Sequence, residues 1–165
     1  MSPAPVERPG VAATLVVVRR ILLAVLLLGM LGTVAELLLI GHDEDVKQLV
    51  PIVLIGLALA VVAWHGVRPG AATVLALRFT MLFFVLSGVV GVVLHFRANM
   101  EFQLDIDPSM AATDLFWKVM RATAPPALAP GTMIQLGLLG LVYTYRHPAL
   151  EHRLELHAGT KGNPT

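Results

Sequence analysis

The stretch from Ile21 to Gly41 is 21 residues long and apolar except for Glu36, and it directly follows Arg19 and Arg20. A helix needs about 20 mostly apolar residues to cross the hydrocarbon core of a bilayer. A secretory signal peptide has a shorter apolar core, of about 7 to 15 residues, and a small-residue cleavage site. We therefore predict an uncleaved membrane-spanning helix at residues 21–41.

Three further apolar segments follow, at about residues 45–66, 71–97 and 126–146. Only 14% of the residues are charged, whereas soluble domains have roughly 25%, so a water-soluble globular protein is excluded. A chain of 165 residues has room for four spans and their connections. We predict an all-α membrane protein in which residues 11–146 form a four-helix transmembrane bundle.

The segments outside the spans are short. Residues 1–10 are rich in proline and are expected to form a disordered tail, and residues 147–165 a C-terminal tail. In the connection between the third and fourth spans, residues 101–107 alternate polar and apolar, which favours an extended segment. Asp107 and Pro108 then predict the start of a short amphipathic helix at about residues 108–122. Its apolar face, expected to lie on the outer leaflet or a partner, consists of Leu115, Phe116, Trp117, Val119 and Met120.

The basic residues indicate how the spans are oriented. Eight of the 12 Lys and Arg residues flank the predicted spans on the side of both termini, and four lie on the opposite side. Because Lys and Arg are enriched in cytoplasmic loops, we expect both termini in the cytoplasm. Nine Arg against three Lys, with much Ala, Val, Leu and Gly, suggests a GC-rich bacterial genome and therefore the bacterial inner membrane.

Small residues at helical spacing indicate which face of each span points into the bundle, since close helix packing in lipid favours them. Glu36 continues a stripe of Gly29, Gly32 and Thr33, and His95 continues one of Ser87, Gly88 and Gly91. Gln48 is in register with Gly56, Ala60 and Ala63, and Gln135 follows Gly131 by one turn. We expect an intramembrane polar cluster at similar depth, made of Glu36, Gln48, His95 and Gln135.

This polar cluster has a functional and a structural interpretation. An ionisable group inside a membrane is a functional candidate because its charged form is costly there unless paired. Alternatively, Glu36 only forms hydrogen bonds or pairs at the rim, and His95 is an interfacial polar group. The acids near the outer end form an acidic rim of Asp43, Glu44, Asp45, Glu101 and Asp105, for which a solvated face is the favoured interpretation.

Specific cofactor chemistry has little support in the sequence. There is no cysteine, which excludes disulfides and thiolate metal sites. Glu36, His42 and His95 are suitable metal ligands by residue type, but their spacing matches no metal motif. No cofactor is strongly implied. The chain has no nucleophile elbow, phosphate loop or dinucleotide fingerprint, so an ordinary hydrolase or kinase is not expected, and whether it is an enzyme of another kind stays open.

We favour the hypothesis of an accessory subunit or interaction partner of a membrane complex, because the soluble segments are too short for a catalytic domain. Its partners would be the lipid bilayer and another protein or further copies of the chain, and the net charge of +1 does not suggest nucleic acid. The alternative is a proton or cation transporter or channel component that uses Glu36 and His95. A membrane redox or metal-binding protein is a third hypothesis.

Overall fold

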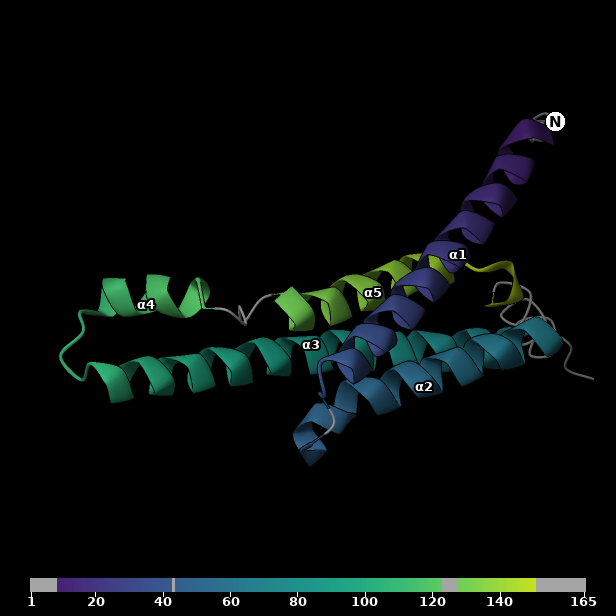
Figure 1. Cartoon of the computed structure of the whole chain (residues 1–165). Coiled ribbons are helices and arrows are strands. Elements are labelled where there is room, and N and C mark those ends of the chain that lie inside the picture. The colour runs from purple at the N-terminus through teal and green to yellow at the C-terminus, as the bar shows by residue number, and fades with distance from the viewer. Residues whose placement is uncertain (1–8, 43, 123–127, 151–165) are drawn as a thin grey trace, which may run out of the picture.

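The computed structural model of the chain describes residues 9–42, 44–122 and 128–150. The regular elements in these ranges are all helices, namely α1 (Pro9–Leu39), α2 (Val46–Val67), α3 (Ala71–Ile106), α4 (Ala112–Met120) and α5 (Leu128–Thr144). In Figure 1, α3 and α5 lie side by side, α2 lies along α3, and α1 crosses the others at an angle. The predicted all-helical class is confirmed. The tail predicted at residues 1–10 and most of that at 147–165 fall outside the described residues.

Three of these helices, α1, α2 and α3, are long and apolar enough to cross a membrane. Helix α5, with 17 residues, is apolar but shorter. The surface of the helices is apolar, with Leu28 73% exposed and Leu39 86% exposed, whereas several of the buried residues are polar. Large exposed apolar surfaces are unstable in water, so this distribution agrees with a multi-pass membrane protein.

The turn between α1 and α2 is built by a glycine in the left-handed conformation. Gly41 has φ 67°, which a residue without Cβ adopts at little cost. The N–H of His42 donates to the carbonyl of Leu37 (2.9 Å), and that of Gly41 to the carbonyl of Leu38 (3.3 Å). This pair of bonds is the Schellman motif that terminates many helices, and it reverses the chain so that α2 runs back along the bundle.

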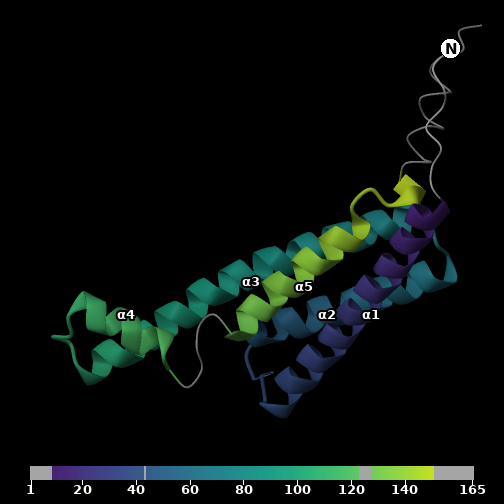
Figure 2. The same ribbon diagram turned by 90° about the horizontal axis from the view of Figure 1, so that it is seen from above.

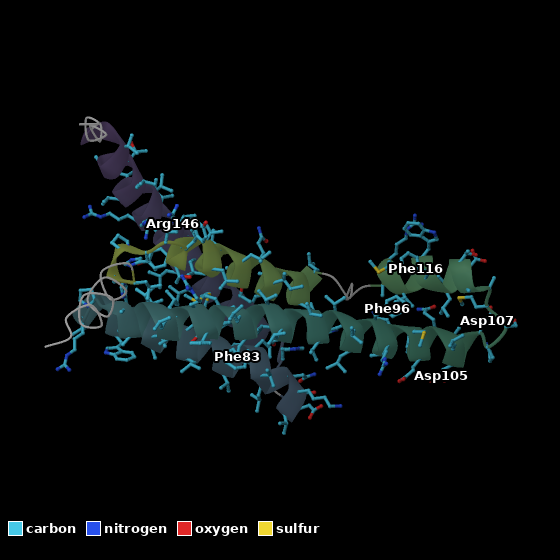
Figure 3. The ribbon with its side chains drawn as sticks, turned by 180° about the vertical axis from the view of Figure 1, so that it is seen from behind. Phe83, Phe96, Asp105, Asp107, Phe116 and Arg146 are labelled. Atoms are coloured by element: carbon cyan, nitrogen blue, oxygen red, sulfur yellow. The ribbon has the colours of Figure 1, made fainter. Side chains whose placement is uncertain are left out.

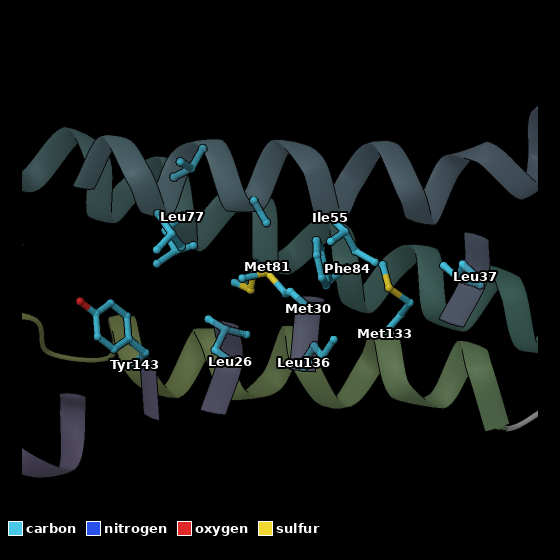
Figure 4. Packing of buried hydrophobic residues seen from close by; sticks show 13 residues of the cluster. Leu26, Met30, Leu37, Ile55, Leu77, Met81, Phe84, Met133, Leu136 and Tyr143 are labelled. Carbon is cyan, nitrogen blue, oxygen red and sulfur yellow. The ribbon is translucent and has the colours of Figure 1, made fainter. Parts of the chain in front are cut away.

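The helices meet in a core between α1, α2, α3 and α5. Its largest fully buried side chain is Phe84 of α3, which lies with Ile55 of α2 and Met133 of α5 (Figure 4). Helices α3 and α5 approach most closely at glycines. A Cβ atom on Gly88 would stand 2.6 Å from the carbonyl oxygen of Pro130, so only glycine permits this approach.

Two ends of the molecule are distinguished below. The N-termini of α1 and α3 and the C-termini of α2 and α5 lie at one end, called the His65 end (Figures 1 and 2). The opposite end carries the α1–α2 turn, the N-terminus of α5 and all of α4, and is called the α4 end. Figure 1 shows that α2 and α3 diverge from the His65 end toward the α4 end.

The connection after the third apolar segment differs from the prediction. Residues 101–106 are not extended but continue α3, which reaches Ile106. Glu101, Gln103 and Leu104 are good helix formers, and lengthening an existing helix avoids the unfavourable nucleation step. Helix α4 starts at Ala112, four residues later than predicted, because Asp107 caps the end of α3 instead of the start of α4.

Candidate functional site

A slot of about 830 Å³ lies at the α4 end, where α2 and α3 diverge (Figure 1). The largest part of its wall comes from α3, between Phe83 and Glu101, and α2 contributes residues between Lys47 and Leu54. Thr33 and Leu37 of α1 and Met133 of α5 also line the slot, as do residues of the α1–α2 connection and of the first turn of α5. Pockets that hold small molecules in proteins have volumes of roughly 300 to 1,000 Å³, so the slot is large enough for a ligand.

The slot brings together two of the four residues of the predicted polar cluster. Gln48 and His95 both line it, and both are half-buried. Gln48 Oε1 accepts hydrogen bonds from the backbone N–H groups of Glu44 (3.1 Å) and Asp45 (3.3 Å), so it also fixes the start of α2. Glu36 and Gln135 are exposed side chains on the surfaces of α1 and α5. The four residues therefore do not converge.

Helical geometry explains why Glu36 lies outside. The buried side chains of α1 are Leu26, Met30, Thr33 and Leu37, at spacings of four, three and four residues. Each residue turns a helix by about 100°, so the buried face continues from Thr33 through Leu37, and Glu36 lies well to one side. Gln135 is two residues from both Met133 and Gly137, which are buried, and so falls on the opposite face of α5.

The acidic rim is also divided. Asp45 and Glu101 line the mouth of the slot, whereas Glu44 and Asp105 are exposed outside it. Asp43 lies outside the described residues. His42, in the α1–α2 turn, joins the mouth, where its ring stacks toward that of His95 with centroids 6.1 Å apart and planes 15° from parallel.

Only two of the three candidate metal ligands lie near each other. His42 and His95 approach each other, but Glu36 is not with them. Among the residues that the structure describes, no three His, Cys, Asp or Glu side chains are grouped so that they could hold a metal ion. Two imidazoles alone leave a tetrahedral or octahedral ion short of protein ligands.

A second feature at the α4 end is the α3–α4 hairpin, defined as residues 97–120. Helix α4 packs on the last turns of α3 and lies alongside them in the antiparallel direction (Figure 1). Phe116 of α4 faces Phe96 of α3 at a ring-centroid distance of 6.2 Å (Figure 3). Of the predicted apolar face, Val119 is buried, Leu115 and Met120 are half-buried, and Phe116 and Trp117 are exposed. Most of this face therefore covers α3 itself, which leaves two aromatic rings available to other molecules.

The tip of the hairpin is held by Asp107. Its carboxylate accepts hydrogen bonds from the Ser109 N–H (3.0 Å) and hydroxyl (2.7 Å). These bonds, with the charge of Lys118, lower the pKa of Asp107. The fixed turn aligns α4 with α3 and opens a groove of about 880 Å³ between them, whose lining includes Phe102 and Trp117.

A third feature, which was not predicted from the sequence, is a buried hydrogen-bonded network at the His65 end. The hydroxyl of Thr73 donates to the carbonyl of Gly70 (2.9 Å), so its other partner, His65 Nδ1 at 2.8 Å, is the donor. In this tautomer His65 Nε2 is the acceptor, and the Tyr143 hydroxyl, 3.2 Å away, donates to it. The network is complete with a neutral imidazole and connects α2, α3 and α5.

His147 covers this network from outside the spans. Its ring centroid lies 5.7 Å from those of both His65 and Tyr143, and its Nδ1 accepts the N–H of Ala149 (3.3 Å). Burial, with smaller contributions from the charges of Arg19 and His65, lowers the pKa of His147. The environment therefore favours a neutral ring.

Two arginines bind the C-terminus of α5 beside the network. Arg78 donates from Nη2 to the carbonyl of Thr144 (2.6 Å), and Arg19 from Nη2 to the carbonyls of Tyr145 (3.3 Å) and Arg146 (2.9 Å). The last carbonyls of a helix lack partners within the helix and carry its negative dipole end. The guanidinium groups donate hydrogen bonds to these carbonyls and offset the negative charge of the dipole end. Arg19 and Arg78 therefore connect α1 and α3 to α5 at this end.

One pattern in the sequence could have indicated that His65 is buried, although not which residues it contacts. Ile55, Ala58, Val62 and His65 follow each other at spacings of three and four residues, and all four are buried. The stripe of small residues chosen for this helix, Gly56, Ala60 and Ala63, is exposed. In α2 the packed face consists mainly of branched side chains, with Ala58 among them, and the small residues of the predicted stripe lie outside.

The chain matches no protein-family model, no curated protein and no solved structure. Its chemistry must therefore be inferred from these three places, namely the slot, the α3–α4 hairpin and the His65 network. The network is internally satisfied and holds helices together, whereas the slot and the hairpin present surfaces that another molecule can contact.

Proposed function

We propose that the chain is a four-span protein of a bacterial inner membrane, with α5 as the fourth span and both termini in the cytoplasm. The support is that α5 is apolar and lies along α3, and that its C-terminus lies at the same end as the N-terminus of α1. Eight of the 12 Lys and Arg residues of the sequence flank the spans on the side of both termini, Arg19, Arg20, Arg68 and Arg146 among them, and four lie on the other side; the positive-inside rule places the side with the excess in the cytoplasm.

We further propose that it acts as a non-catalytic subunit, which docks a partner protein on the α3–α4 hairpin. The observation that carries this proposal is the length of α3. Its 36 residues extend about 54 Å at about 1.5 Å per residue, whereas the hydrocarbon core is about 30 Å thick. The last turns of α3, from Arg97 onward, therefore project beyond the hydrocarbon, and α4 packs on this projecting part.

The projecting part has the surface of a binding element. Phe102 is 63% exposed, Ile106 65% and Trp117 55%, although they lie beyond the apolar segment of α3. Exposed aromatic and aliphatic groups in a polar setting mark interaction sites, and Trp is over-represented where binding energy concentrates. Phe102 and Trp117 both line the hairpin groove, together with Asp114 and Arg121, so a partner would find an apolar centre between charges of both signs.

A protein partner is favoured over the outer leaflet by the direction of α4. A helix that lies flat on a membrane runs in the membrane plane and would cross the spanning helices steeply. Helix α4 instead lies along α3 (Figure 1), and its Val119 is buried. The exposed rings are therefore presented along the side of a projecting hairpin.

The alternative of cation transport through Glu36 and His95 has less support. A relay would need the two groups on one path, but Glu36 is exposed on α1 and His95 lines the slot. The third hypothesis, a redox or metal protein, relies on two imidazoles and has no further ligand in the described residues.

The docking proposal is tested by site-specific photocrosslinking in intact membranes. A photoreactive phenylalanine at Trp117 or Phe102 should give one adduct of defined mass with a single protein, identified by mass spectrometry. The same residue at Leu138 or Val142, exposed on α5, is the matched control and should give lipid adducts. Only lipid adducts at the two hairpin positions, or the same protein adducts at all four positions, would contradict docking on the hairpin.

A further inference from the structure

The slot at the α4 end is elongated along α3. Its lining on this helix extends from Phe83 to Glu101, 18 residues apart in the numbering, or about 27 Å at about 1.5 Å per residue. Three of its lining residues, Val50, Leu86 and Val90, are 45%, 59% and 56% exposed. The slot therefore opens along its side to the surrounding membrane, and a molecule in the bilayer can enter it laterally.

The polarity of the slot changes along its length. Its deeper part, toward the His65 end, is walled by apolar side chains such as Leu54, Phe83 and Leu86. Its mouth, at the α4 end, carries the imidazoles of His42 and His95 and the amide of Gln48. A long site that is apolar at one end and polar at the other fits an amphiphile that lies parallel to α3.

The depth of the apolar part corresponds to one leaflet. Phe83 and Leu94, which bound it on α3, are 11 residues apart, or about 16 Å along a helix. Half of a hydrocarbon core about 30 Å thick is about 15 Å. An acyl chain of the leaflet at the α4 end would therefore fill this part, and its headgroup would reach the mouth.

The mouth also carries charged side chains of both signs. Lys47 and Arg97 are cations, and Asp45 and Glu101 are carboxylates, and all four are exposed and line the slot. Lys and Arg bind phosphate through charge-assisted hydrogen bonds, whereas a carboxylate accepts hydrogen bonds from an ammonium group. A headgroup with a phosphodiester and an amine meets complementary groups here, whereas a purely anionic headgroup would also face the two carboxylates.

We propose that the slot is a binding site for one phospholipid with a zwitterionic, amine-bearing headgroup. The phosphate lies at Lys47 and Arg97, the ammonium group at Asp45 and Glu101, and one acyl chain occupies the slot as far as Phe83. This site is separate from the hairpin groove that would dock a partner, so each proposal can fail without the other.

The test is lipid retention by the full-length protein purified in mild detergent from membranes or from nanodiscs of known composition. We expect about one phosphatidylethanolamine per chain after detergent exchange, measured by native mass spectrometry and by lipid extraction. Lys47→Gln with Arg97→Gln should reduce the retained lipid at least fivefold. Both side chains are exposed, so the double variant should remain folded.

The matched control is Arg20→Gln with Arg68→Gln, which removes the same charge from exposed positions at the His65 end and should retain the lipid.

In the deep part of the slot, Ser87→Phe should exclude the acyl chain, and Val90→Phe is a second variant if the first is not monodisperse. Equal lipid loss in both double variants would overturn the proposal, as would wild-type protein without stoichiometric lipid. Preferential retention of phosphatidylglycerol over phosphatidylethanolamine would overturn the zwitterionic assignment.

Discussion

His65 illustrates how a polar side chain is accommodated among apolar helices. Only 9% of its surface is exposed, and both ring nitrogens have partners on other helices, Thr73 and Tyr143. A buried polar group without a partner costs roughly 1 to 3 kcal/mol, whereas a satisfied network specifies one arrangement of helices. The network therefore fixes the relative rotation of α2, α3 and α5 at this end.

The lowered pKa of His147 predicts how the stability of the folded protein depends on pH. Because its pKa in the folded protein lies below the ordinary value of about 6.5, the unfolded chain binds more protons in the window below pH 6.5. Its contribution to stability is complete above that value and is lost as pH falls through the folded pKa. The thermal unfolding midpoint in detergent should therefore decrease between pH 7.5 and 5, and His147→Asn should show a smaller decrease. Equal decreases in the two proteins would contradict this reading of His147.

Among the helices, the pair α3 and α5 depends most on small residues. Gly88→Ala should destabilise the protein, because the new Cβ would stand 2.6 Å from the carbonyl oxygen of Pro130 and this backbone can yield only if the helices separate. We expect a loss of about 1 to 3 kcal/mol, as for overpacking in a core, measured by unfolding of the purified protein in detergent.

The control for this substitution is Gly56→Ala in α2, where a Cβ would meet nothing within 4 Å. Alanine favours helix over glycine by roughly 0.8 to 1 kcal/mol in water, so this variant should be neutral or slightly more stable. If both variants behave alike, the close approach of α3 and α5 does not limit stability.

The sequence predicted the helices more reliably than their packed faces. Apolar length is a property of one segment, so α1, α2 and α3 could be recognised directly. The inward face of α3, with Gly88 buried and His95 in the slot, also followed from the small-residue stripe. In α2 the same rule chose the wrong side, because the packed face depends on the partner helix and there it consists of larger residues such as Ile55.

The candidate site was only partly predictable for the same reason. Gln48 and His95 both line the slot, but a small difference in helix rotation moves a residue such as Glu36 from the interior to the surface. The His65 network joins residues 65, 73 and 143, and the last of these is distant in sequence from the other two. No local pattern signals such a contact, so it emerges only when the helices are packed together.

The arrangement of all the helices predicts which segments share a side of the membrane. The chain has no cysteine, so a single introduced thiol can be labelled without removing others. Gly10→Cys and Pro148→Cys, both exposed at the His65 end, should react with a membrane-impermeant maleimide only in inverted vesicles. Ala111→Cys, exposed near the hairpin tip, should react only from the opposite side. Reaction of all three from one side would contradict four spans.

The helices also differ in length, and this has a consequence for the surrounding lipid. The described part of helix α5 has 17 residues, a length of about 26 Å, whereas the 22 residues of α2 extend about 33 Å. A hydrocarbon core about 30 Å thick fits the second but exceeds the first. Hydrophobic mismatch of a few ångströms costs fractions of a kcal/mol per ångström and is relieved by local thinning of the bilayer. With α5 as the proposed fourth span, the membrane beside it is expected to thin, so that shorter acyl chains gather along this flank and the protein partitions into thinner bilayers.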